Sequence, residues 1–107
     1  MERLNDIHWH DCELIAAVEI PSQNVLVLNV KYPDDWENNI FSLKGIVFED
    51  YCSQQVNEIP FEGRPTLLEA SVQCAEEDYF VIRIETNAGY RIVKAKRVFL
   101  GSPVQNL

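Results

Sequence analysis

The fold of this chain is decided by residues 79–100, which read YFVIRIETNAGYRIVKAKRVFL. Phe80, Ile82 and Ile84 point to one face and the residues between them to the other, and this period of two in β-branched and aromatic residues is typical of a strand. The four residues TNAG that follow are turn residues, because Asn and Gly tolerate a positive φ. The chain then runs extended again, so the stretch predicts two antiparallel strands joined by a tight turn.

The register of this hairpin follows from the distribution of charge. With a three-residue loop, Ile82 would lie opposite Lys94. A shift of one residue instead places Ile82 opposite Val93 and Phe80 opposite Ala95, and it gathers the charged side chains on the other face. Since a slip of one residue exchanges the two faces of a strand, the second register is favoured, with a loop of two or four residues or a bulge at the glycine. The predicted core face consists of Phe80, Ile82, Ile84, Val93, Ala95 and Phe99.

The size and charge of the chain limit its class. A length of 107 residues predicts a single domain over residues 1–107, and a hydrophobic fraction of 47% is enough for one core. The formal net charge is −8, from 17 acidic and 9 basic residues. Such a chain repels phosphate backbones and anionic membranes, so we expect neither a nucleic-acid nor a membrane partner. The acidity suits either solubility alone or a basic protein partner.

The expected cellular compartment determines whether the cysteines are oxidised or reduced. No apolar run approaches the roughly 20 residues of a membrane-spanning helix, and the opening residues MERLND lack the pattern of a secretory signal, so we expect a cytoplasmic protein. Cys12, Cys52 and Cys74 have irregular spacing and form no CxxC pair. In a reducing compartment we expect free thiols that behave as small buried hydrophobic residues, with one disulfide or a reactive thiol as alternatives.

Other segments also predict strands. Residues 25–32, VLVLNVKY, form a clear strand pattern, and the turn residues before them predict a hairpin with a first strand over residues 14–20. A helix competes over 14–20, because Leu, Ala and Glu favour it. Further strands are expected over residues 40–51, where Gly45 marks a bulge, and over residues 66–74, where a helical turn or two over residues 66–71 is the alternative. Residues 33–39 and 53–65 are expected to be loops. The predicted fold is all-β, or β-rich α+β, with about six antiparallel strands in a sandwich or an open barrel built from hairpins.

The loop PDDWENN carries the best candidate for a binding surface. Pro33 and the acidic residues after it suit a single helical turn. Trp36 lies among Asp34, Asp35 and Glu37, and an aromatic residue with an acidic rim has the composition of an interface anchor. The alternative is that Trp36 folds back and covers one end of the core.

The segment HWHDC, residues 8–12, is the densest group of metal-binding side chains. In an extended segment His8 and His10 share one face, and two imidazoles together with Asp11 can begin a transition-metal site. Further Asp, Glu or Cys ligands would have to come from elsewhere in the chain. The alternative is that Trp9 packs into the core and that Asp11 accepts backbone hydrogen bonds where the chain enters the first strand.

No catalytic constellation is visible in the sequence. Cys12 follows His10 and Asp11, but adjacent side chains on a strand point to opposite faces. The paired acidic residues fall in expected loops and strand ends, where carboxylates are ordinarily solvated. The EF-hand, P-loop and dinucleotide-binding patterns are absent. We therefore expect a non-enzymatic protein with no cofactor.

The residues Trp9-His10-Asp11, followed at once by a strand and then by β hairpins, resemble the opening of small bacterial β domains. Some of these domains are similar to immunity proteins of polymorphic toxin systems. The resemblance covers the layout of the whole chain, but its motif is only these three residues. It implies a cytosolic bacterial protein that binds and blocks a toxin, and it carries over no binding residue. An acidic inhibitor would suit a basic toxin, because complementary charge speeds association.

Three hypotheses follow from the sequence. The first is a non-enzymatic binding protein, in the form of an immunity-type inhibitor, whose residues Asp34, Asp35, Trp36 and Glu37 meet a basic protein. The second is a metal- or small-ligand-binding domain built on His8, His10 and Asp11. The third is a self-associating structural module, so the chain is expected to be either a monomer or a homodimer.

Overall fold

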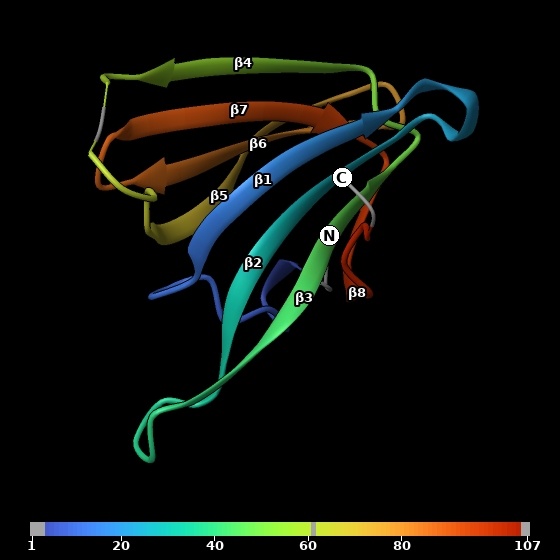
Figure 1. The fold of residues 1–107 in the computed structure, drawn as a ribbon. Helices are drawn as coiled ribbons and strands as arrows, with labels where there is room; N and C mark the ends of the chain where they lie inside the picture. The colour runs from blue at the N-terminus through green and yellow to red at the C-terminus, as the bar shows by residue number, and fades with distance from the viewer. Residues whose placement is uncertain (1–3, 61, 106–107) are drawn as a thin grey trace.

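The structure is a computed structural model that describes residues 4–60 and 62–105, and it is all-β (Figure 1). Its strands are antiparallel and fall into two sheets of four, which lie one behind the other. The elements are β1 (Glu13–Ile20), the 3-10 turn η2 (Pro21–Gln23), β2 (Val25–Asp35), β3 (Ile40–Glu49), β4 (Ser53–Glu58), β5 (Leu67–Glu76), β6 (Tyr79–Thr86), β7 (Gly89–Ala95) and β8 (Arg97–Gly101).

The two sheets are open and share one hydrophobic core. The first has the order β1-β2-β3-β8 and the second the order β4-β7-β6-β5. The predicted all-β class and hairpin construction are confirmed, although the described chain has eight strands rather than about six. No helix among the described residues is long and apolar enough to cross a membrane.

The β6–β7 hairpin has the register that the charge pattern favoured. Phe80 pairs with Ala95 and Ile82 with Val93, and the loop between Thr86 and Gly89 has two residues. Of the predicted core face, four members are fully buried, namely Ile82, Ile84, Val93 and Ala95, and Phe80 packs against the core from its margin. The period-two pattern therefore identified the inner face of the second sheet.

The chain does not continue as one strand after this hairpin, as residues 90–100 suggested. It breaks at Lys96, so that β7 belongs to the second sheet and β8 to the first. The backbone N–H of Lys96 donates to the carbonyl oxygen of Glu49 at 3.1 Å, which ties the crossing to β3. In β8 it is Val98 that is buried, whereas Phe99 pairs with Val47 on the outer face, so the inclusion of Phe99 in the core face was wrong.

β4 (Ser53–Glu58) was missed, because residues 53–65 were expected to form a loop. Its sequence SQQVNE has none of the apolar alternation that marks a strand, and its side chains are exposed or half-buried. It forms through backbone pairing with β7, from Ser53 opposite Lys94 to Glu58 opposite Gly89. An edge strand has only one neighbour and buries little side-chain surface, so its composition can stay polar.

The strands β2 and β3 are also longer than expected. Residues 33–39 do not begin with a helical turn; β2 continues through Pro33 to Asp35 with a bulge between these two residues. A bulge is one of the few places where a strand tolerates proline, which has no N–H to donate. Gly45, expected to mark a bulge, lies in regular pairing with Asn29.

The reason for Gly45 is the close approach of the segment that follows β8. A Cβ at this position would lie 2.3 Å from the carbonyl oxygen of Ser102, so only glycine fits. Asn29 fixes the same segment: its Nδ2 donates to the Val104 carbonyl oxygen at 2.8 Å, and the Val104 N–H donates to its Oδ1 at 2.9 Å. Residues 102–105 thus cover part of the outer face of the first sheet.

The core also takes in the segment before β1. Leu4, Ile7, Trp9 and Cys12 are all buried, and the indole Nε1 of Trp9 donates to the Leu4 carbonyl oxygen at 2.9 Å. The interpretation that Trp9 packs into the core is confirmed. Because this segment joins a core formed by both sheets, the described chain has one continuous hydrophobic interior.

Candidate functional site

The clearest surface feature is a projecting hairpin, the arm, formed by residues 31–44 where β2 and β3 extend past the rest of the sheet (Figure 1). The turn of the arm comprises residues 36–39, in which Asn39 has a positive φ of 57° and donates its N–H to the Trp36 carbonyl oxygen. The molecule is 41 Å along its longest axis and 27 Å and 26 Å along the others. The predicted binding residues Asp34, Asp35, Trp36 and Glu37 all lie on the arm.

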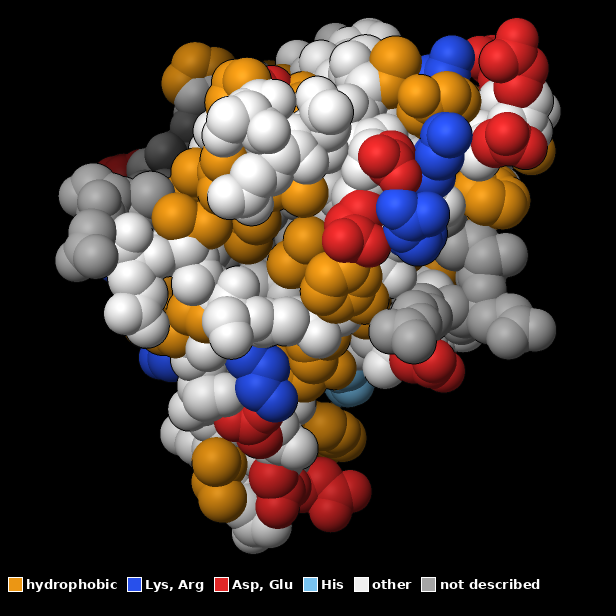
Figure 2. All heavy atoms as spheres, turned by 90° about the vertical axis from the view of Figure 1, so that its right-hand side faces the viewer, with side chains coloured by type: hydrophobic (Ala, Val, Ile, Leu, Met, Phe, Trp, Pro, Cys, Tyr) orange, Lys and Arg blue, Asp and Glu red, His pale blue; other side chains and the backbone are white. Residues whose placement is uncertain are grey.

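The arm exposes large apolar side chains. Trp36 is 60% exposed, Ile40 53% and Leu43 61%. Trp36 therefore does not fold back onto the core, which was the alternative interpretation of this residue. Figure 2 shows hydrophobic and acidic side chains together at the end of this projection. An exposed aromatic residue beside carboxylates is the composition that the sequence suggested for an interface.

The acidic residues of the arm have different roles. Asp34 forms an ion pair with Lys44, with 2.8 Å between Oδ1 and Nζ. Hydrogen bonds from Lys44 and Ser42 hold the pKa of Asp34 below its usual value of 3.8, so it is ionised at neutral pH. The ammonium of Lys44 also lies over the ring of Tyr32, at 5.0 Å from its centroid. These contacts tie Asp34 to β3 and leave its charge largely compensated.

Asp35 shapes the turn rather than standing free. Its Oδ2 accepts a hydrogen bond of 2.7 Å from Nδ2 of Asn38, and its Oδ1 accepts a longer one of 3.3 Å from the Asn38 backbone. Glu37, at the tip, has no ion pair within the described part of the chain. Trp36 and Glu37 are therefore the two predicted residues that the fold itself does not use.

A cleft lies along the arm, from Trp36 at its turn to the point where β1 and β2 begin to pair. This arm cleft has a volume of about 320 Å³ and is lined by Asp11, Glu13, Lys31, Trp36, Phe41 and Thr66. Glu13 on β1 pairs with Lys31 on β2, and Glu13 also forms a bridge to Thr66 at the start of the second sheet. Strand pairing thus brings three distant segments of the chain to one place.

Two of the residues that line the cleft, Phe41 and Glu13, each contact a cation within the chain. The ammonium of Lys31 lies 5.5 Å from the centroid of the Phe41 ring. Nη1 of Arg64 lies 3.4 Å from Oε1 of Glu13, in an ion pair whose side chains are 56% and 36% exposed. Exposed ion pairs of this kind contribute little to stability, on the order of 0 to 1 kcal/mol, so they exchange readily for others.

The sequence pointed to only part of this cleft. Trp36 was predicted as a binding residue and Asp11 as a metal ligand, but Glu13, Lys31, Phe41 and Thr66 were not singled out. The one feature of the sequence that could have indicated the cleft is the pair of opposite charges, Glu13 and Lys31, at the open end of a predicted hairpin. It requires the register of β1 against β2, and that register includes a bulge between Leu14 and Ala16.

The histidine cluster is arranged differently from the expectation. Residues 8–12 do not run extended; they turn, with Asp11 at a positive φ of 69° and the Cys12 N–H donating to the Trp9 carbonyl oxygen. Nδ1 of His10 lies 3.0 Å from Oδ2 of Asp11, and both side chains are exposed. The Asp11 backbone N–H donates to the Leu67 carbonyl oxygen. Within residues 4–60 and 62–105, no three His, Cys, Asp or Glu side chains come together as ligands for a metal ion.

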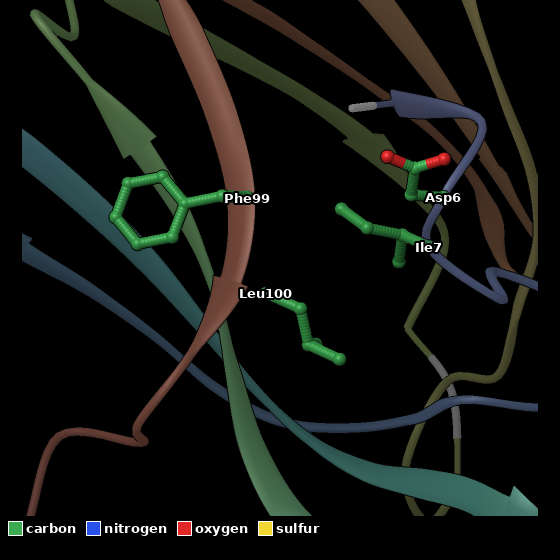
Figure 3. Close-up of a pocket in the computed structure, with 4 residues that line it drawn as sticks. All are labelled: Asp6, Ile7, Phe99 and Leu100. Carbon is green, nitrogen blue, oxygen red and sulfur yellow. The ribbon is translucent and has the colours of Figure 1, made fainter. Parts of the chain in front are cut away.

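A second hollow, of about 220 Å³, lies between the segment before β1 and β8. Figure 3 shows the side chains of Ile7 and Leu100 pointing toward each other across it, with the Asp6 carboxylate above them and the Phe99 ring on the other side of β8. It offers a single carboxylate over apolar side chains. The arm cleft, with two aromatic rings and two carboxylates, has the richer recognition chemistry.

The comparisons with known proteins add no assignment to this geometry: no protein-family model matches the sequence, and no curated protein or solved structure shows significant similarity to it. The class that the fold defines is an antiparallel β protein of two open sheets with a projecting arm. Its function has to be argued from the site.

Proposed function

We propose that this protein is a non-enzymatic binding protein that docks a basic protein partner through the tip of its arm. The observation that carries the proposal is Trp36, which is 60% exposed at the end of a hairpin that itself projects. Trp is enriched among the residues that dominate the binding energy of protein interfaces. Ile40 and Leu43 are further exposed apolar side chains of the arm, on opposite faces of β3.

The charge of the molecule supports a basic partner. The net charge is −8, and Glu37 stands beside Trp36 without an ion pair in the described chain. A field of one sign steers a partner of the opposite sign and raises the association rate. In its finer form, the proposal is an immunity-type inhibitor in a bacterial cytoplasm that blocks a basic toxin, which the resemblance of Trp9-His10-Asp11 suggests.

The test is affinity capture with the full chain at low and at high salt, using three versions of the protein. The wild type is expected to retain a basic protein at low salt and to lose much of it at high salt. Trp36→Ala with Glu37→Gln is expected to retain at least tenfold less, because interface anchors of this kind contribute about 2 kcal/mol or more. Asp78→Asn is the charge control, since Asp78 is an exposed acid in the turn between β5 and β6, at the opposite end of β5 from Thr66 of the cleft.

The identity of the captured protein then tests the finer form. Co-expression with the wild type is expected to relieve any growth arrest that the captured protein causes, and co-expression with the arm variant is expected not to. Capture that ignores both salt and the arm substitutions would contradict docking through the arm.

Self-association is the weaker alternative for the same molecule. The edge strand β5 is exposed along most of its length, with Leu68 and Val72 each 38% exposed. However, two irregularities interrupt its pairing, and Glu69 and Glu76 place carboxylates along it. Bulges and charges are devices by which edge strands avoid pairing with other chains, so this edge favours a monomer.

A further inference from the structure

We infer that the arm cleft receives an arginine side chain of the basic partner, an inference that rests on the function proposed above and specifies its chemistry. The guanidinium would stack on the aromatic walls formed by Trp36 and Phe41 and pair with the carboxylates of Asp11 and Glu13. All four side chains line one cleft of about 320 Å³.

The aromatic walls favour a cation. The face of an indole or phenyl ring attracts a positive charge within about 6 Å of its centroid, and Trp is the strongest of these rings. The ammonium of Lys31, which also lines the cleft, already lies 5.5 Å from the centroid of the Phe41 ring, so this ring takes a cation and an incoming guanidinium would displace Lys31 from it. The indole of Trp36 has no such cation over it among the described residues.

The carboxylates complete the site. Asp11 faces His10 at 3.0 Å, and Glu13 faces Arg64 at a longer distance of 3.4 Å. Both pairs are exposed to solvent, so an incoming cation can replace either partner at low cost. The Glu13–Arg64 contact is itself a guanidinium held by a carboxylate at the rim of the cleft.

Arginine fits this combination better than lysine. Its planar guanidinium can stack on a ring and pair with two carboxylate oxygens at the same time, and it loses less hydration than an ammonium. An ammonium is a compact charge that satisfies one such contact at a time. The occupant is therefore expected to be an arginine from the same basic surface that meets the arm tip.

The experiment follows binding of a short blocked oligoarginine peptide to the ¹⁵N-labelled full chain by NMR. The signals to watch are the indole N–H of Trp36 and the backbone amides of Glu13 and Phe41, with the indole of the buried Trp9 as an internal reference. Oligolysine of the same length is the competing probe. We expect oligoarginine to shift the three cleft signals and to bind more tightly than oligolysine.

Two double variants distinguish binding in the arm cleft from general attraction of a cationic peptide to an acidic protein. Asp11→Asn with Glu13→Gln removes the cleft charges, and Asn suits the positive φ at position 11. Glu69→Gln with Asp78→Asn removes the same charge from exposed positions on the second sheet. The cleft variant is expected to weaken oligoarginine binding roughly tenfold and the control less than about twofold, as the loss of two local charge contacts requires.

Three outcomes of the peptide experiment would contradict the arginine site. Shifts spread evenly over the acidic surface, equal weakening by both double variants, or equal binding of the two peptides would overturn the arginine site. A captured partner that binds the arm-tip variant more weakly than the wild type, but binds the cleft variant as tightly as the wild type, would also overturn the arginine site. Docking through the arm would then still stand. If the arm-tip substitutions have no effect on partner binding, the proposed function fails whatever the peptides do.

Discussion

The three cysteines carry the same side chain, but the fold gives them different chemistry. Cys12 is fully buried and its thiol donates to the His8 carbonyl oxygen at 3.0 Å. Burial, with a smaller contribution from the charge of Asp11, raises the pKa of the Cys12 thiol from 9.0 to about 12. Cys52 and Cys74 are free and exposed, so the expectation that all three would be buried was wrong for these two. Only Cys12 behaves as a small core residue.

We therefore expect a thiol-directed alkylating reagent at pH 8 to modify Cys52 and Cys74 in the native protein and to leave Cys12 intact. The reactive form is the thiolate, and Cys12 combines a raised pKa with no access to solvent. Peptide mass mapping before and after denaturation measures the modification. Cys12→Ala should give the same native pattern. Native Cys12 reacting at the rate of the other two would refute the assignment.

At the scale of the element, the edge strand β4 is held by more than its backbone ladder. Arg91 on β7 donates from Nε and Nη2 to the two carboxylate oxygens of Glu58, at 2.8 Å and 2.9 Å. Its Nη1 also reaches Oε1 of Gln54 at 3.4 Å. The side chains of Arg91 and Glu58 are only 13% and 10% exposed, so this two-point contact is shielded from water. It fastens both ends of β4 to its neighbour.

Glu58→Gln is expected to destabilise the protein by about 1 to 3 kcal/mol, because it leaves a largely buried guanidinium without its counter-charge. Glu76→Gln is the matched control: it removes a carboxylate that pairs with Lys94 at 2.8 Å, but on the solvent-exposed side of the sheet. Its denaturation midpoint should stay close to that of the wild type. Urea titration followed by far-ultraviolet circular dichroism makes the comparison, and equal midpoints for the two variants would contradict the role of the Arg91–Glu58 pair.

At the scale of the whole molecule, the two sheets depend on each other. The buried cluster joins Leu26, Leu28 and Phe48 of the first sheet to Ile82 and Ile84 of the second, and it includes the segment before β1. Neither open sheet of four strands covers its own inner face. Each therefore needs the other to remove that apolar surface from water.

Truncation of Ile84, which has no exposed surface, should therefore weaken both sheets at once. We expect Ile84→Ala to cost about 2 to 5 kcal/mol, as for other large-to-small changes in a core. In a Trp36→Phe background, the fluorescence of Trp9 reports on the N-terminal segment while circular dichroism reports on all strands. The unfolding midpoints from fluorescence and from circular dichroism should coincide in the Trp36→Phe protein and shift together when Ile84→Ala is added. A fluorescence midpoint that differs from the circular dichroism midpoint would show that the N-terminal segment unfolds independently of the sheets.

Elements with a locally alternating pattern of burial could be predicted from the amino-acid sequence. The register of β6 against β7, the strand β2 and the all-β class follow from a period of two, because one buried face requires apolar residues at every second position. Three other features became visible only in the folded chain: the polar strand β4, the crossing at Lys96, and the arm cleft that joins Asp11, Glu13, Lys31 and Phe41. Edge pairing uses backbone groups that every residue has, and a cleft between strands depends on bulges and long-range register, so neither leaves a local pattern in the chain.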